Sequence, residues 1–270
     1  MKKVENLKAL NFFEKDMSKN LYICDNLVNA GKSGYAVKTI HFYTSSGQPS
    51  YEYISFSENV FNELIVEINT DNADLISLAS KKIKNDFQNY SAVKIGNSDT
   101  KFFDTDLFKN YFTLNKLHIS EYGVFANYSC DDIPKLELPD NIKIEVIKNL
   151  KNTKHIRYST RALDGLKSII KHSKEDDLLF IVLYNNAVAG YLAAGNSYKN
   201  VYDIINVFIS PKQRGKSLGT FLTIYFSNYC YNNGFIPFYG TAVSKYSKQV
   251  AIKSGYTETS RVSYAEIALN

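Results

Sequence analysis

Ten residues of the chain, Ser210–Gly219 with the sequence SPKQRGKSLG, combine the residue types that bind phosphate groups. Gly215 and Gly219 let the backbone approach a ligand closely, and Arg214 and Lys216 carry positive charge. A strand-like run, YDIINVFI, precedes the segment, and apolar residues at spacings of three and four follow it, which predicts a helix. Where a helix begins directly after such a turn, its unpaired N–H groups and its dipole favour an anion. The segment therefore predicts a phosphate-binding loop.

A magnesium nucleotide is the first ligand to consider, because eight residues from Ser210 approximate the pattern G-x-x-x-x-G-K-[ST]. That pattern needs glycine at its first position and an aspartate after a later strand to hold magnesium. Ser210 stands at the first position here, and residues 218–270 contain no aspartate. The sequence therefore favours a phosphate that is bound without magnesium.

The segments RGKSLG (Arg214–Gly219) and SKYSKQVAIKSGY (Ser244–Tyr256) resemble two motifs of the GNAT superfamily of acyl-CoA-dependent N-acyltransferases. RGKSLG (Arg214–Gly219) is similar to the family signature [RQ]-x-x-G-x-[GA], with Ser217 in place of the first glycine. SKYSKQVAIKSGY (Ser244–Tyr256) is similar to the family pattern N-x-x-[AS]-x-x-x-[AY]-x-K-x-G-F, with Ser244 in place of the asparagine. The resemblance covers residues 140–270 approximately, and together the motifs are fairly specific.

The resemblance implies a binding site for acetyl-CoA that needs no metal. The strand before the loop would present its backbone to the pantetheine arm, the loop amides would hold the pyrophosphate, and two serines would lie beside the arm near the thioester. The expected cofactor-binding residues are Val207, Phe208, Ile209, Arg214, Gly215, Lys216, Ser217, Leu218, Gly219, Thr220, Ser244 and Ser247. Ser217 brings a Cβ where the family has none, so the phosphates are expected to lie less close to the loop and to bind with lower affinity.

Acyl transfer to an amine needs a base for the ammonium proton and an acid for the departing thiolate. Asp203 matches the position where several family members carry their base, and it is the only acid between Asp177 and Glu258. A carboxylate that balances Lys199 and Lys212 is an equally good interpretation. The segment Glu175–Asp177 is expected to be a solvated loop.

The acid is where the sequence departs from the family. Many relatives have a tyrosine at the position of Ala251, and Tyr246 could replace it only with a different geometry. An aromatic residue that serves packing alone is the other interpretation of Tyr246. The predicted catalytic residues are therefore Asp203 and Tyr246.

The length of 270 residues predicts two domains, and the segment CDDIPKLELPDN marks a boundary between 1–138 and 139–270. Beyond it we expect a strand at Ile142–Ile147, a helix near 152–172, and a hairpin around Asn185-Asn186. A strand, the loop, a helix, a strand, a helix and a last strand then follow. The expected fold class is α/β with a mixed sheet: a GNAT fold after residue 138, and before it an α/β domain that resembles a degenerate copy.

Charge divides the chain in the same way. Residues 141–270 hold 17 Lys and Arg against 8 Asp and Glu, a net of +9, whereas residues 1–140 hold 15 against 19, a net of −4. The basic half suits an anionic cofactor, and the acidic half suits a cationic amine. Three scattered cysteines and four scattered histidines predict neither disulfides nor a metal site. No signal peptide or membrane span is apparent, so a cytoplasmic protein is expected.

These patterns predict an enzyme that transfers an acetyl group from acetyl-CoA to the primary amine of a small molecule or a peptide by direct attack. The main alternative is an acyl-CoA-binding module with weak or no catalysis. Nucleic-acid binding by the basic half is a third and weaker interpretation, no membrane partner is expected, and a homodimer is left open.

Overall fold

The computed structural model describes residues 1–32, 37–60, 62–86, 89–90, 92–112, 119–127, 129–148, 150, 166, 170 and 173–267. The chain divides into two compact units, which we call the amino-terminal unit (residues 1–122 and 260–270) and the carboxy-terminal unit (residues 123–259). The predicted domain boundary at 138/139 falls inside the carboxy-terminal unit. Whether residues 1–138 and 139–270 fold independently stays a prediction.

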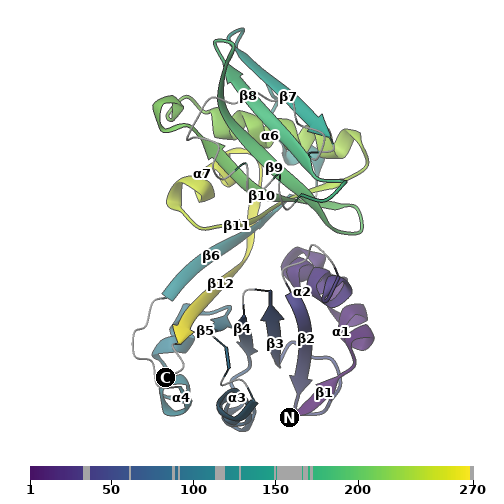
Figure 1. Ribbon diagram of the computed structural model, residues 1–270, viewed down its shortest axis with the longest axis vertical. Coiled ribbons are helices and arrows are strands. Elements are labelled where there is room, and N and C mark those ends of the chain that lie inside the picture. Colours follow the sequence, from purple (N-terminus) through teal and green to yellow (C-terminus); the bar gives the residue numbers. More distant parts are fainter. Residues whose placement is uncertain are drawn as a thin grey trace. The chain divides into compact units, whose positions relative to one another are not determined.

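The amino-terminal unit has a sheet with the order β1-β2-β3-β4-β5-β12 (Figure 1). Neighbouring strands are antiparallel except β4 and β5, which are parallel and joined by α3. Its elements are β1 (Lys2–Val4), α1 (Asn6–Phe13), α2 (Met17–Asn29), β2 (Val37–Thr44), β3 (Tyr53–Asn59), β4 (Glu63–Asn69), α3 (Ala73–Asp86), β5 (Ala92–Asn97) and α4 (Asp106–Tyr111).

The carboxy-terminal unit has a sheet with the order β7-β8-β9-β10-β11-β6. Again one neighbouring pair is parallel, β10 with β11, and a helix, α6, joins its strands. Its elements are β6 (Ile119–Ala126), β7 (Ile142–Lys148), β8 (Leu178–Tyr184), β9 (Ala187–Tyr198), β10 (Val201–Ile209), α6 (Leu218–Asn232), β11 (Ile236–Ala242), α7 (Lys245–Lys253) and the start of β12 (Thr257–Ile267). The expected α/β class and the repeat of one strand order in both halves are confirmed.

Each sheet is completed by a strand from a distant part of the chain. In the amino-terminal unit, Ser263–Ile267 of β12 pair with β5. In the carboxy-terminal unit, Gly123–Ala126 of β6 pair with β11. The last strand of the sequence therefore belongs mostly to the first unit.

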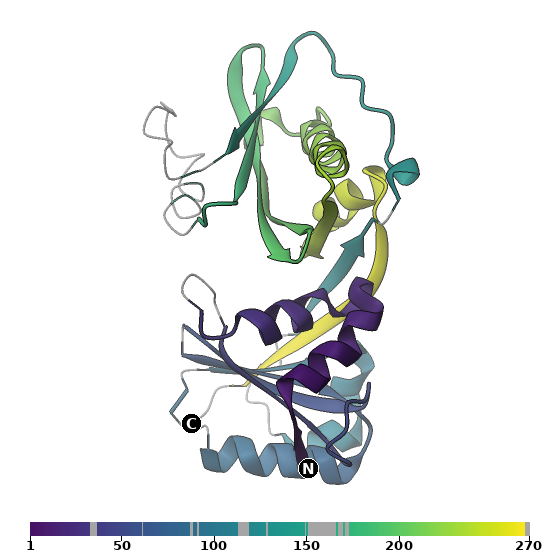
Figure 2. The ribbon, with the colours of Figure 1, turned by 90° about the vertical axis from the view of Figure 1, so that its right-hand side faces the viewer.

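Helices cover both faces of the amino-terminal sheet (Figure 2). On one face Leu75, Ile76 and Ala79 of α3 pack on a core from β3, β4 and β5. On the other face Phe13 of α1 lies 5.3 Å from the ring of Phe42 on β2. In the carboxy-terminal unit the buried stripe of α6, with Leu218, Leu222, Phe226 and Cys230, packs on β8, β9 and β10. The apolar spacing that predicted this helix is the spacing of its buried face.

Most expected elements have a counterpart. The strand predicted at Ile142–Ile147 is β7, and the hairpin predicted around Asn185-Asn186 is formed by β8 and β9. The helix expected near 152–172 lies almost entirely outside the described residues.

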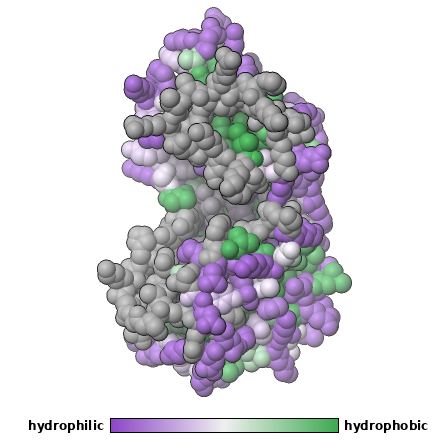
Figure 3. Space-filling model, viewed as in Figure 1, coloured by the Kyte–Doolittle hydropathy of each residue, from purple (hydrophilic) through white to green (hydrophobic). Residues whose placement is uncertain are grey.

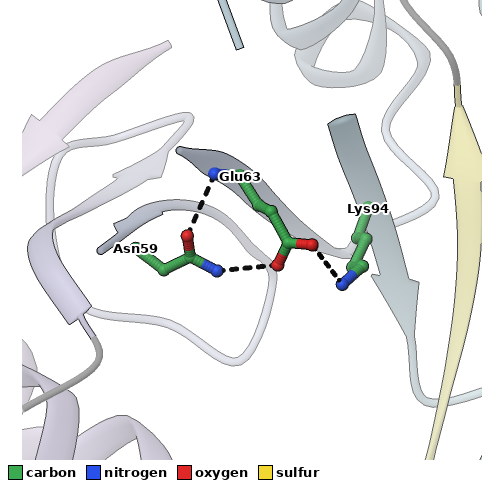
Figure 4. A network of polar contacts seen from close by, with 3 residues as sticks. All are labelled: Asn59, Glu63 and Lys94. Carbon is green, nitrogen blue, oxygen red and sulfur yellow. Dashed lines mark hydrogen bonds and ion pairs between the residues drawn. The ribbon is translucent and has the colours of Figure 1, made fainter. Parts of the chain in front are cut away.

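A polar network joins three strands of the amino-terminal sheet (Figure 4). Lys94 Nζ lies 2.9 Å from Glu63 Oε1, and Asn59 Nδ2 donates to Glu63 Oε2 at 2.8 Å. These two bonds hold the pKa of Glu63 below its ordinary value. Each bond joins different strands, so the network fixes the register of β3, β4 and β5.

No helix in the described part of the chain is long and apolar enough to cross a membrane. In the view of Figure 3, which is that of Figure 1, the hydrophobic residues among those that are coloured form small separate patches.

Candidate cofactor and active site

The edge of β10 separates from β11 halfway along its length. Only Val201, Tyr202 and Asp203 pair with β11, whereas pairing with β9 continues to Ile209. Among the described residues, the backbone of 204–209 therefore has no strand partner on the β11 side. An extended ligand with amide groups could bond there as an added strand.

A β-bulge between Ile204 and Asn206 changes which side chains face α6. Before the bulge, Tyr202 and Ile204 pack in the core beneath α6, and after it Val207 and Ile209 do so. Asp203 lies between two of these residues, so its side chain is on the opposite face. The bulge thereby keeps an apolar base under the loop and leaves Asp203 on the other side.

The loop between β10 and α6 is shaped by two residues with positive φ. A 3-10 turn, Pro211–Gln213, is followed by Gly215 at φ 81° and Ser217 at φ 58°. Ser217 is the N-cap of α6 but makes no side-chain cap hydrogen bond. No described backbone carbonyl outside α6 accepts from the N–H groups of residues 215–220. These donors converge at the positive end of a helix, which is the arrangement that binds phosphate.

The charged side chains of the loop are held by local contacts. Arg214 Nε donates to the carbonyl of Ile209 at 3.2 Å. Lys216 Nζ donates to Gln213 Oε1 at 2.7 Å and lies 3.9 Å from the ring centroid of Tyr184. Both charges stay on the exposed side of the loop, where they add to the positive potential of α6.

Gly219, in the first turn of α6, lies against α7 and the end of β10. A Cβ built at this position would be 3.6 Å from Val250 Cγ2 and 3.7 Å from Ile209 Cγ1. These are ordinary contacts, so the position tolerates a small side chain but has walls on two sides. The first motif and the second, which contains Val250, therefore meet at Gly219.

The serines of the second motif have partners within the protein. Ser244 is the N-cap of α7, and its Oγ accepts from the N–H of Ser247 at 3.1 Å. Ser247 Oγ lies 3.1 Å from the hydroxyl of Tyr239, a buried residue of β11. Burial raises the pKa of Tyr239. Ser244 therefore caps α7 and Ser247 bonds with Tyr239, whether or not either serine also contacts a cofactor.

The two predicted catalytic residues differ in setting. Asp203 is half-buried at the last position where β10 pairs with β11, and so lies where the strands separate. The side chain of Tyr246 is 80% exposed on the first turn of α7. The structure does not bring these two residues together through any hydrogen bond. Tyr239, which the sequence analysis did not select, has a hydroxyl that a hydrogen bond with Ser247 holds in place.

Asp177 is a second residue that the sequence analysis missed. We expected Glu175–Asp177 to be a solvated loop, and for Asp177 this is wrong, because only 5% of the residue is exposed. Its Oδ2 accepts from the N–H of Lys174 at 2.8 Å. Burial raises the pKa of Asp177, and the bond and charge of Lys174 offset this only in part.

No group of His, Cys, Asp and Glu in the described residues could hold a metal ion. Among the described residues of the carboxy-terminal unit, the open strand edge and the α6 terminus are features that could bind a cofactor.

Residues 145–251, which include the open edge, the loop and most of α7, match the acetyltransferase (GNAT) family. The carboxy-terminal unit contains a GNAT domain. None of the curated proteins matches the chain significantly. The GNAT match thus begins in β7 and ends in α7, and it supports acyl transfer as the general class of activity.

Solved structures resemble the whole chain. A GCN5-related N-acetyltransferase-like protein from Streptococcus suis has a TM-score of 0.54 at 15% identity, over 98% of this chain and 100% of that one. A Drosophila protein reaches 0.61 at 11% identity, over 100% and 98%. A tandem GNAT protein from the clavulanic acid biosynthesis pathway reaches 0.56 at 9% identity, over 100% and 98%. At these identities the likeness shows the fold alone, and it extends over both units.

Proposed function

We propose that the protein transfers an acetyl group from acetyl-CoA to a primary amine by direct attack, without a covalent enzyme intermediate. The observation that carries this proposal is the combination, in one GNAT domain, of an open β10 edge with an uncapped α6 terminus. The edge offers bonds to the pantetheine arm, and the terminus offers N–H donors to the pyrophosphate. Within the described residues of the amino-terminal unit, no feature combines the two.

The cofactor would be held by backbone more than by side chains. Val207, Phe208 and Ile209 would pair with the pantetheine amides. The amides from Arg214 to Thr220 would hold the pyrophosphate, with the charges of Arg214 and Lys216 nearby. Ser244 and Ser247 would lie beside the arm near the thioester.

The reaction moves protons at the amine and at the sulfur. Asp203 would take a proton from the ammonium group of the acceptor, and the free amine nitrogen would attack the thioester carbonyl carbon. The C–N bond forms, the C–S bond breaks, and the CoA thiolate leaves, while the nitrogen gives its second proton to water as it becomes a neutral amide. Tyr246 or water would then return a proton to the sulfur. A thiolate is a tolerable leaving group, so turnover does not depend wholly on that acid.

The first experiment measures CoA binding and thiol release. CoA at a hundredfold its Kd should stabilise the protein by about 2.7 kcal/mol, whereas ATP or DNA should not. Thiol release from acetyl-CoA should then require an amine from a panel of alkylamines, diamines and peptides. A protein that millimolar CoA fails to stabilise would sink the cofactor assignment.

Asp203→Asn tests the base. Loss of a general base lowers kcat by about 100-fold or more, and CoA binding should be unchanged because Asp203 lies outside the loop. Full activity of this variant from pH 6 to 9 would exclude Asp203 as the base.

The acid is tested by a matched pair of tyrosine variants. If Tyr246 donates the proton, Tyr246→Phe should lower kcat about tenfold or more and change its alkaline limb, whereas Tyr239→Phe should not. The opposite result would move the acid to the Tyr239 and Ser247 hydroxyl pair. No effect of either variant would indicate water.

The alternative function is an acyl-CoA-binding module with weak or no catalysis. It is favoured by the 80% exposure of Tyr246, which leaves the proposed acid without a fixed position. Stabilisation by CoA without amine-dependent thiol release would select this function.

A further inference from the structure

Asp177, Gly195 and Asp203 form one row across three neighbouring strands. Gly195 on β9 is the register partner of Asp203 on β10. On the other side of β9, Leu178 of β8 pairs with Ala194, so Asp177, the residue before β8, comes opposite Gly195. Directly opposite residues point to the same face, with Cβ atoms about 4.5–5.5 Å apart. The two aspartates therefore flank a glycine on the face opposite α6.

The carboxylate of Asp177 reaches over Gly195. A Cβ built on Gly195 would lie 2.7 Å from Asp177 Oδ1 and 3.1 Å from Ile205 Cδ1. Real Cβ atoms do not come this close to oxygen, so glycine is the residue that leaves Asp177 its place. Because Asp203 is the next residue of the row, this reach brings the Asp177 carboxylate closer to that of Asp203.

Asp177 is buried with one carboxylate oxygen uncommitted. Its Oδ2 accepts from the N–H of Lys174, and no described residue donates a hydrogen bond to Oδ1. The charged groups that act on it are Lys174, which favours the carboxylate, and Asp176, which disfavours it. Burying a carboxylate costs free energy unless a cation or donor accompanies it. A cationic ligand would supply what this oxygen lacks.

We propose that Asp177 and Asp203 together bind the acceptor as its ammonium ion, and that the acceptor is an amine with no carboxylate beside its amino group. This rests on the proposed function, and it adds a residue and a substrate class to it. An ammonium ion placed over the row would meet the uncommitted oxygen of Asp177 beside a second negative charge, that of Asp203, whereas an α-amino acid would bring a third carboxylate against the two. Asp203 then takes the proton, and Asp177 serves as a binding residue.

The test compares two probes that differ by one carboxylate, n-butylamine and norvaline. With wild-type protein, thiol release should show kcat/KM at least tenfold higher for butylamine. Asp177→Asn should raise the KM for butylamine about tenfold, leave CoA binding unchanged and narrow the preference over norvaline. Asn keeps an oxygen for the Lys174 N–H, so the turn should survive, and an unchanged melting temperature checks this.

Asp176→Asn is the matched control, because Asp176 is the adjacent acid in the sequence and is exposed. It removes the same charge but should leave both KM values unchanged. Equal effects of the two variants would mean that the loss of one negative charge, and not the position of Asp177, explains the result, and this would overturn the proposal. An Asp177→Asn variant that behaves like wild type would also overturn it.

Binding of butylammonium to the CoA-loaded protein, measured by calorimetry, separates this inference from the proposed function. Binding that needs Asp177 but leads to no thiol release would support the ammonium site and contradict the enzymatic function. Amine-dependent release that is indifferent to Asp177 would support the function and contradict the ammonium site.

Discussion

The helices α3 and α6 hold corresponding positions in the two units, since each joins the parallel pair of strands, but their amino termini differ. In the amino-terminal unit β4 leads to α3 through three residues, and Asn72 Oδ1 accepts from the N–H groups of Asp74 and Leu75. Asp74 also places a negative charge in the first turn. In the carboxy-terminal unit eight residues lead to α6, three of them basic, and no side chain caps the helix. One terminus is satisfied by its own chain, and the other remains available to a ligand.

The parallel strand pairs differ in the same sense. β4 and β5 pair over five residues, from Glu63 to Glu67, and beyond them Asn97 Nδ2 donates to the carbonyl of Ile68. β10 and β11 pair over only three residues. A strand order shared by both units therefore does not make a cofactor site. The site depends on which backbone groups the protein leaves without internal partners.

Each pair also ends on a carboxylate, with a different environment. Glu67 is the last residue of β4 that pairs with β5, as Asp203 is for β10 with β11. Ser55 and Tyr264 donate to Glu67 at 3.4 Å, and burial still raises its pKa. Two hydroxyls of the protein donate to Glu67, and Asp203 is the carboxylate that we propose acts on the substrate.

The largest effect should come from Ala265→Asp, which asks whether β12 supports only the first unit. Ala265 is fully buried in the core of the amino-terminal unit, so a charge there should destabilise that unit by more than about 3 kcal/mol. Hydrogen exchange should accelerate in β4 and β5, while the stabilisation of β10 and α6 by CoA persists. Thr257→Asp, at the exposed start of the same strand, is the control. Equal loss of protection in both units would mean that they do not unfold separately.

Next in size is Gly219→Asp, which gives α6 the first-turn acid that α3 has at Asp74. The carboxylate should repel the pyrophosphate and weaken CoA binding at least 100-fold, about 2.7 kcal/mol. The favourable effect of an acid at a helix amino terminus should offset part of the cost of placing this charge against Val250 and Ile209. The reverse change, Asp74→Gly, should leave CoA affinity and a stoichiometry of one per chain unaltered in calorimetry. Retained CoA affinity in Gly219→Asp would move the phosphate site elsewhere.

The smallest effects concern the backbone of the loop. Gly215→Ala should lower the free energy of unfolding by about 1 kcal/mol through the positive φ alone, because its Cβ would have no neighbour within 4 Å.

Ser217→Gly should have the opposite effect: it should raise the free energy of unfolding by about 1 kcal/mol or less and tighten CoA binding a few fold. Urea denaturation with and without CoA measures both. A destabilised Ser217→Gly variant would show that the serine has a role that φ does not reveal.

The sequence was sufficient for features that depend on local chemistry. Apolar residues at spacings of three and four predicted α6, because one face of a helix must be apolar to pack on a sheet; they are Leu218, Phe221, Leu222, Tyr225 and Tyr229. The glycines and cations of Ser210–Gly219 predicted a phosphate loop, because backbone freedom and charge belong to the residues themselves. The repeat of the fold before residue 138 followed from the order of elements, although no motif marks it.

Only the tertiary structure decided which distant residues share a face. A hairpin counted from Asn185-Asn186 would place Leu178 opposite Ala193, but a bulge between Val182 and Leu183 places it opposite Ala194. One inserted residue moves every later side chain to the other face, so Asp177 joins Asp203 across Gly195. The pairing of β12 with β5, which places the end of the chain in the amino-terminal unit, likewise depends on contacts between residues far apart in the sequence. Bulges and strand partners are set by the sum of many packing contacts, and no short segment of the sequence contains that sum.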